Sequence, residues 1–189
     1  DETYWIGLTN GLAHGRKSTA KIINSSNSNL QSDTINGITV SDDGILWLAT
    51  DAGVSYLKPG EASFKNINHF SHKQLPEGIV TAVAVDGGTA WIGTFDNGLY
   101  RYEIAGGNVT KVLYDPLRDG ALHSQAITSL LALPKRGLIV GTYGGGLSVV
   151  DSDGQVVRTI RSLAGSQISD IIYALLLDHD DGILIGNEQ

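Results

Sequence analysis

Two short groups of side chains have the types and spacing that metal ions use. His69 and His72 are separated by two residues, and residues 178–181 read Asp-His-Asp-Asp. A pair of imidazoles can supply two zinc ligands, and neighbouring carboxylates attract calcium. The His pair has no third ligand at a position fixed by the sequence, and the acidic group falls in a predicted hairpin turn. We therefore predict solvent-exposed turns, with no metal and no other cofactor.

Seven side chains in predicted loops combine aromatic rings with carboxylate, amide, hydroxyl and imidazole groups, and could bind a ligand without covalent chemistry. They are Phe95, Asp96, Asn97, His123, Ser124, Gln125 and Tyr143. Binding residues concentrate on loops that a rigid scaffold holds in place, although plain solvent-facing loops have the same composition. The three Trp residues, 5, 47 and 91, could also stack on a ligand, but their place inside apolar strands favours core packing.

The sequence gives little support for covalent catalysis or for phosphate binding. There is no Cys among 189 residues, which excludes disulfides, thiolate catalysis and Cys-ligated zinc. Glycines 144–146 do not stand between a strand and a helix, as a phosphate-binding loop requires. Ser, His and Asp are plentiful, but no spacing brings three of them together. We predict that the chain is not an enzyme and has no catalytic residues.

The composition is that of a globular protein, with 41% hydrophobic and 17% charged residues. The net charge of −7 and the absence of a basic block argue against nucleic acid as a partner, because phosphate contacts need Lys and Arg. The longest apolar run, Ile171 to Leu177, is too short to span a bilayer. We predict no membrane segment in this chain.

One pattern recurs four times along the chain. An aliphatic residue is followed twelve positions later by Trp or an aliphatic residue, and the first members are Ile35, Ile79, Ile127 and Ile172. The resulting repeat of 44 to 48 residues is the length of one propeller blade. Each unit also contains turn signals such as Asp43-Gly44 between apolar runs, which predict four antiparallel strands.

These units predict an all-β chain, a β-propeller fragment of about four blades over residues 1–189. Its expected parts are a partial blade 1–34, blades 35–78, 79–126 and 127–171, and a partial blade 172–189. The expected strands number seventeen, one more than a closed ring of four blades needs. We therefore expect a partial ring, roughly half of a propeller of seven or eight blades.

A motif of the form Trp-(Ile/Leu)-(Gly/Ala)-Thr followed by a turn ending in Gly-(Leu/Val) accompanies the repeat. It is present at 47–54 and 91–99, and at 139–147 with Ile in place of Trp, while the copy at 5–12 has Leu8 in place of Thr. An aliphatic residue also precedes each first strand, at Leu30, Leu75, Leu122 and Ile168. This pattern resembles the two-component regulator propeller repeat of bacterial histidine kinases and diguanylate cyclases.

The resemblance implies a non-catalytic, ligand-binding sensor in the periplasm, the extracytoplasmic part of an inner-membrane protein whose other parts include a kinase or cyclase module. It implies a small-molecule ligand of carbohydrate type. The family supplies no catalytic residues. Two alternatives remain open: an enzyme resembling the streptogramin lyases, which needs His and a carboxylate at the ring centre, and a scaffold for protein partners.

A partial ring also exposes the faces of its end blades. We expect apolar faces at the two ends, formed by Trp5, Ile6, Ile172, Leu175 and Leu184. Exposed apolar faces favour association with another surface, so we expect self-association through the open blade edges.

Overall fold

The computed structural model describes residues 3–16, 19–134, 136–161, 168–180 and 182–188, and these residues form strands and loops without a helix. Seventeen strands, the number expected, form five antiparallel sheets. The first sheet contains β1 (Tyr4–Leu8), β2 (Gly11–Gly15) and β3 (Lys21–Ile23). The second contains β4 (Ile35–Val40), β5 (Leu46–Thr50), β6 (Gly53–Leu57) and β7 (Lys65–Ile67).

The remaining sheets follow the same plan. The third contains β8 (Val80–Asp86), β9 (Thr89–Thr94), β10 (Leu99–Glu103) and β11 (Val109–Lys111). The fourth contains β12 (Ile127–Leu133), β13 (Gly137–Thr142), β14 (Leu147–Val150) and β15 (Val156–Ile160). The last contains β16 (Ile172–Leu177) and β17 (Ile183–Asn187). In every sheet each strand pairs with the next along the chain, which is the meander predicted for a propeller blade.

The first strands of neighbouring sheets are linked by a repeated hydrogen bond. Each of β4, β8, β12 and β16 begins with a β-bulge, so one residue has no opposite residue on the second strand. The bulge side chain donates to the first carbonyl of the next first strand: Asn36 to Val80 at 3.0 Å, Thr81 to Ile127 at 2.6 Å, and Thr128 to Ile172. The bulges therefore fix the position of each sheet against the next.

A contact between a glycine and an isoleucine spaces the sheets. A methyl group built on Gly93 would lie 2.5 Å from Cγ2 of Ile127, and one on Gly141 would lie 2.7 Å from Cγ2 of Ile172. Gly7 has the same relation to Ile35. In the remaining interface Ala49 replaces Gly and Val80 replaces Ile, and both are buried in one cluster. The larger residue on one sheet is thus matched by a smaller one on the other.

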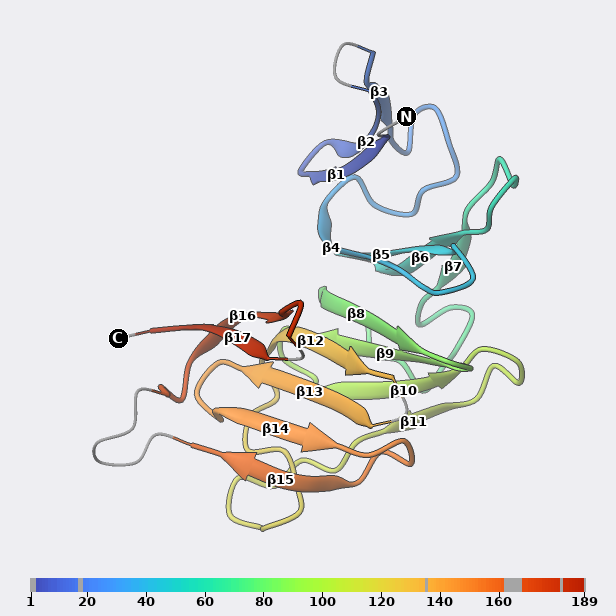
Figure 1. Ribbon diagram of the computed structural model, residues 1–189. Helices are drawn as coiled ribbons and strands as arrows, with labels where there is room; N and C mark the ends of the chain where they lie inside the picture. The colour runs from blue at the N-terminus through green and yellow to red at the C-terminus, as the bar shows by residue number, and fades with distance from the viewer. Residues whose placement is uncertain (1–2, 17–18, 135, 162–167, 181, 189) are drawn as a thin grey trace.

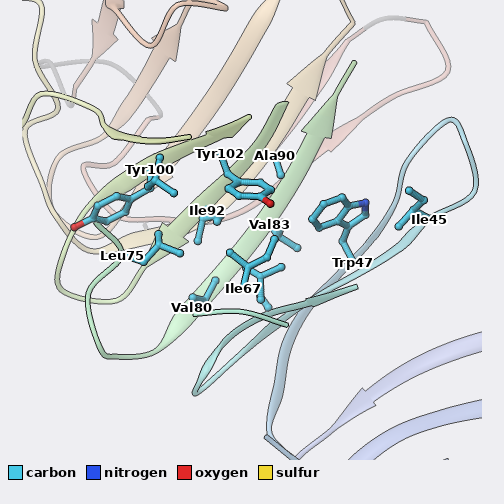
Figure 2. Close-up of a cluster of buried hydrophobic side chains, with 13 residues drawn as sticks. Ile45, Trp47, Ile67, Leu75, Val80, Val83, Ala90, Ile92, Tyr100 and Tyr102 are labelled. Atoms are coloured by element: carbon cyan, nitrogen blue, oxygen red, sulfur yellow. The ribbon is translucent and has the colours of Figure 1, made fainter. Parts of the chain in front are cut away.

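The core lies between the sheets. Trp47 is fully buried and Trp91 is 2% exposed, and Figure 2 shows Trp47 directed at Val83 and Ala90 of the following sheet. Leu75, in the connection between two sheets, is part of the same cluster, and Leu30 and Leu122 are buried in the equivalent connections. The expected packing role of Trp47 and Trp91 is confirmed.

The sequence prediction placed the start of the first strand of the third sheet one residue too early, at Ile79. β8 begins at Val80, which is buried, whereas Ile79 precedes the strand and is 40% exposed. The hairpin of this sheet closes on Asp86 and Thr89, and it is one residue shorter than the hairpin between Val40 and Leu46. Because this hairpin is one residue shorter, counting twelve residues from Ile79 still reaches Trp91. The structural equivalent of Ile35 is nevertheless Val80 and not Ile79. The fourth strands β7 and β11 have only three residues each.

The sheets follow one another along an open arc, with β1–β3 at one end and β16–β17 at the other (Figure 1). The prediction of its exposed end faces was partly wrong. Ile6 is 48% and Leu184 53% exposed, as expected, but Ile172 is fully buried. Trp5 packs against the second sheet and Leu175 against the fourth, because successive side chains of a strand point to opposite faces.

The size-matched contact between sheets leads to a compensation experiment. Replacement of Gly93 by Ala should lower the free energy of unfolding by about 1 to 3 kcal/mol, because the new methyl group overlaps Ile127. In a variant with Ile127→Ala, which lacks the overlapping Cγ2, Gly93→Ala should cost less than it does beside Ile127. Urea unfolding of the single and double variants measures both effects.

Gly88→Ala is the matched control, because a methyl group built there meets no atom within 4 Å. A double variant that is as unstable as the sum of its single variants would contradict size matching.

Candidate functional site

The predicted ligand-binding residues lie in turns between second and third strands and in the connection between the third and fourth sheets. The turns between second and third strands meet the connections that lead into the next first strand, and backbone hydrogen bonds join the two. Gly98 N–H donates to Gln125 at 2.9 Å, and the N–H groups of Gly144 and Gly146 both donate to Asp170 at 2.9 Å. Phe95 and Tyr143 N–H donate instead to Ile79 and Ala126, in the connections that lead into their own sheets. Loops from consecutive sheets therefore form one continuous surface.

A buried threonine supports each of these turns. The hydroxyls of Thr50, Thr94 and Thr142 each donate to the carbonyl of the glycine that ends the turn, all at 2.8 Å. The same hydroxyls accept a backbone N–H of the turn at 3.0 to 3.2 Å. All three side chains are at most 2% exposed. The Thr of the repeat motif therefore shapes the turn and is not itself exposed at the surface.

A groove of about 250 Å³ opens on this surface between the second and third sheets. One wall is the turn after β5, and the other is the connection from β7 to β8. The lining residues are Asp51, Ala52, Asn68, His69, Phe70, Pro76, Glu77 and Gly78.

The groove combines an exposed ring with fixed polar groups. Phe70 is 79% exposed, and the Lys73 ammonium lies 5.8 Å from its ring centre. The Asp51 carboxylate accepts a hydrogen bond of 2.9 Å from Asn36. The His69 ring bonds the Leu75 carbonyl through Nδ1 at 2.9 Å, and its Nε2 lies 3.9 Å from the Glu77 carboxylate.

Asp96 and Asn97 lie beside this groove, and Phe95 precedes them in the same turn. A methyl group built on Gly78, in the groove wall, would lie 3.7 Å from Oδ1 of Asp96 and 3.8 Å from Nδ2 of Asn97. The Asn97 amide donates to Asp96 at 2.6 Å, and the Phe95 ring is 60% exposed. Burial, and secondarily the charge of Asp96, raise the pKa of the Tyr100 phenol, so this ring below the turn remains neutral.

Two of the other predicted residues make hydrogen bonds that connect neighbouring loops. The Ser124 hydroxyl donates to the Tyr143 carbonyl at 2.8 Å and accepts the Ala126 N–H at 3.2 Å. The Gln125 carbonyl accepts a hydrogen bond from the Gly98 N–H. The Tyr143 ring, equivalent in position to Phe95, is 56% exposed. Of this group, Tyr143 has the side chain most accessible to a ligand.

His123 lies apart from the groove, in a cavity of about 480 Å³ beside the outer strand of the fourth sheet. The cavity is lined by Asp119, Gly120, His123 and residues 157–161. His123 Nε2 lies 3.3 Å from the Arg118 carbonyl, and its buried Nδ1 has no hydrogen-bond partner among the described residues. The seven predicted residues thus divide between two places on the molecule.

The two groups considered for metal binding have other contacts. His72 bonds Ser71 through Nδ1 at 2.9 Å and packs edge-on against Tyr102, while His69 faces Glu77. His179 contacts Asp178 in the hairpin turn after β16, and Asp181 lies outside the described residues. No three His, Cys, Asp or Glu side chains gather as metal ligands within the described ranges.

Sequence reasoning missed Asp51, Asn68, Phe70 and Glu77 as groove residues. Asp51 stands directly after Thr50, as Phe95 stands after Thr94 and Tyr143 after Thr142. Extending the candidate list to every residue after a motif Thr would have found Asp51. Phe70 and Glu77 lie in a connection that has no equivalent spacing in the other units, and no sequence pattern marks them.

Comparison with solved structures finds the same architecture. The extracellular domain of the proposed one component system BT4673 from B. thetaiotaomicron is 23% identical, with a TM-score of 0.77 over 98% of this chain and 25% of that one. The extracellular domain of the proposed hybrid two component system BT3049 from the same organism is 18% identical, with a TM-score of 0.77 over 98% and 24%. The WD40 beta propeller domain of Doa1 is 10% identical, with a TM-score of 0.64 over 99% and 59%.

The fold is that of a β-propeller. The chain spans about a quarter of the length of the two extracellular domains that it resembles. No family model and no curated protein matches it. Among the described residues, none forms a helix with the length and apolar character needed to cross a membrane.

The buried threonines provide a test of how the site is supported. Thr94→Val should lower the free energy of unfolding by about 1 to 3 kcal/mol, because the Gly98 carbonyl and the Asn97 N–H lose their shared buried hydroxyl. Thr94→Ser keeps that hydroxyl and should lose much less. Thermal unfolding of both variants measures the difference, and equal losses would mean that packing of the methyl group supports the turn.

Proposed function

We propose that this chain is a non-catalytic ligand-binding part of an extracytoplasmic sensor in a bacterial signalling protein. The observation that supports this most is the match of 98% of the chain to extracellular domains of proposed one and two component systems, at a TM-score of 0.77. The motif Thr, which shapes the ligand-facing turns in three consecutive units, is consistent with a scaffold that presents loops. A periplasmic location follows from the same proposal.

The groove between the second and third sheets is the proposed binding site, and a carbohydrate is the proposed ligand. A sugar ring presents apolar C–H faces that pack on aromatic rings, and Phe70 and Phe95 offer such rings at 79% and 60% exposure. Its hydroxyl groups need both donors and acceptors. Carboxylates at Asp51 and Asp96 and the amide of Asn97 supply them around the groove.

The groups found around the groove favour binding over catalysis. A propeller lyase would need a His and a carboxylate directed at the ring centre. Among the described residues, His14 stacks on Trp5 with ring centres 3.7 Å apart, and His72 packs against Tyr102. His69 and Glu77 face each other across 3.9 Å, but in the groove between two sheets.

Titration calorimetry against short oligosaccharides of glucan, mannan and xylan tests the proposal. One member of the panel should bind, and Phe70→Ala or Phe95→Ala should weaken binding about tenfold, the loss expected when one ligand-contacting ring is truncated. Val40→Ala is the control, because Val40 is 57% exposed and lies at the opposite end of the β4–β5 hairpin from Thr50 and the groove.

A ligand that binds all these variants equally would place the site elsewhere. Absence of binding across the panel would remove the carbohydrate assignment, and chemical conversion of a panel sugar, seen by chromatography, would contradict the non-catalytic role.

A further inference from the structure

One side chain of the second sheet connects the packing of the sheets with the candidate groove. Asn36 is the bulge residue of β4, and its amide nitrogen Nδ2 has two hydrogens to donate. One hydrogen bond, of 3.0 Å, goes to the Val80 carbonyl and links this sheet to the next. The other, of 2.9 Å, goes to Oδ1 of Asp51 in the groove wall. A single amide therefore bonds both the neighbouring sheet and a groove carboxylate.

The equivalent side chains of the next two sheets do not make this connection. The bulge residues Thr81 and Thr128 also bond the next first strand, but a hydroxyl has a single hydrogen to donate. The residues that follow the motif Thr in those sheets are Phe95 and Tyr143, which have no carboxylate. Among these three sheets, the amide and the carboxylate therefore occur together only where the turn forms the wall of the groove.

The bond from Asn36 leaves most of the Asp51 carboxylate free for a ligand. Both side chains are exposed, and a carboxylate has about four lone-pair sites. Because Oδ1 is held, the plane of the carboxylate is fixed while both oxygens keep lone pairs for donors in the groove. A carboxylate in a fixed plane can accept two donors side by side, and such charge-assisted bonds are about twice as strong as neutral ones.

We propose that Asp51 selects sugars with hydroxyl groups on two neighbouring ring carbons, and that Asn36 is its positioning residue. This inference rests on the carbohydrate-binding function proposed for the groove. Equatorial hydroxyls project from the edge of a sugar ring, whereas its C–H bonds form the faces. The groove offers Asp51 for the edge and the exposed ring of Phe70 for a face.

The two contacts differ in what they discriminate. Packing on Phe70 is available to any sugar with an apolar face, so it contributes affinity without selecting a pattern of hydroxyls. Asp51 only accepts hydrogen bonds, so a sugar without two adjacent donors leaves one of its oxygens unpaired inside the groove. A site built to bond hydroxyl groups rejects analogues that lack them. Asp51 therefore contributes specificity.

Titration calorimetry with four hexasaccharides tests the selection. Three are 1,4-linked, of glucose, mannose or xylose, and each inner unit has hydroxyls on neighbouring carbons. The fourth is 1,3-linked glucose, whose inner units have no such pair. We expect the wild type to bind a 1,4-linked member at least about tenfold more tightly than the 1,3-linked one.

The variant Asn36→Thr separates positioning from structure. It removes the bond to Asp51 but keeps a donor for the Val80 carbonyl, as Thr81 and Thr128 show in the equivalent place. Its unfolding in urea should match that of the wild type, while the preference for the 1,4-linked sugar falls about threefold to tenfold. Asp51→Asn should lower the preference similarly. The double variant should be no worse than Asp51→Asn alone, because both changes act through one contact.

Phe70→Ala is the matched control, because it should weaken the binding of both kinds of sugar and leave their ratio unchanged. The proposal is overturned, and the binding function stands, if Phe70→Ala weakens binding but Asn36→Thr and Asp51→Asn leave the preference unchanged. A wild type that prefers the 1,3-linked hexasaccharide also overturns it. A loss of stability in Asn36→Thr with equal weakening for all sugars would make Asn36 purely structural. Absence of binding to all four hexasaccharides would contradict the carbohydrate function itself, and this inference with it.

Discussion

The contact between a second-strand glycine and the first residue of the next first strand determines how close two sheets can lie. Gly93 and Gly141 leave room for Ile127 and Ile172, and where the glycine becomes Ala49 the opposing residue is the smaller Val80. Because close packing tolerates neither overlap nor voids, the two sizes must be chosen together. The bulge hydrogen bonds from Asn36 and Thr81 then set the sheets in register at the same point.

The loop surface depends on this arrangement. The turns that begin at Thr50 and Thr94 are held by their own buried hydroxyls, but only the packing of the sheets brings one turn next to the connection that leads into the following sheet. The groove between Asp51 and Glu77 exists because the second and third sheets pack at that distance. The turns therefore share one backbone support, while the side chains that they present differ from unit to unit.

The strands and their order could be predicted from the sequence because the repeat appears in apolar positions and turn residues. The register in the third sheet could not, because a shorter hairpin after Val85 compensated for the wrong choice of Ile79. The candidate loops were found, but not the groove, since Phe70 and Glu77 come from a connection with no periodic pattern. The hydrogen bonds of the Ser124 hydroxyl to the backbone of Tyr143 and Ala126 could not be predicted either, because only the three-dimensional positions of those residues reveal them.

The most direct test of the spacing contact compares the same substitution at two equivalent glycines. A methyl group on Gly7 would overlap Ile35 of the next sheet, 2.8 Å from its Cγ2, whereas one on Gly186 would meet only Ala174 of its own sheet, at 3.4 Å. The free energy of unfolding in urea should fall by about 1 to 3 kcal/mol for Gly7→Ala and by much less for Gly186→Ala. Equal losses at the two positions would show that the glycines are required by their own strands and not by the neighbouring sheet, and would contradict the account.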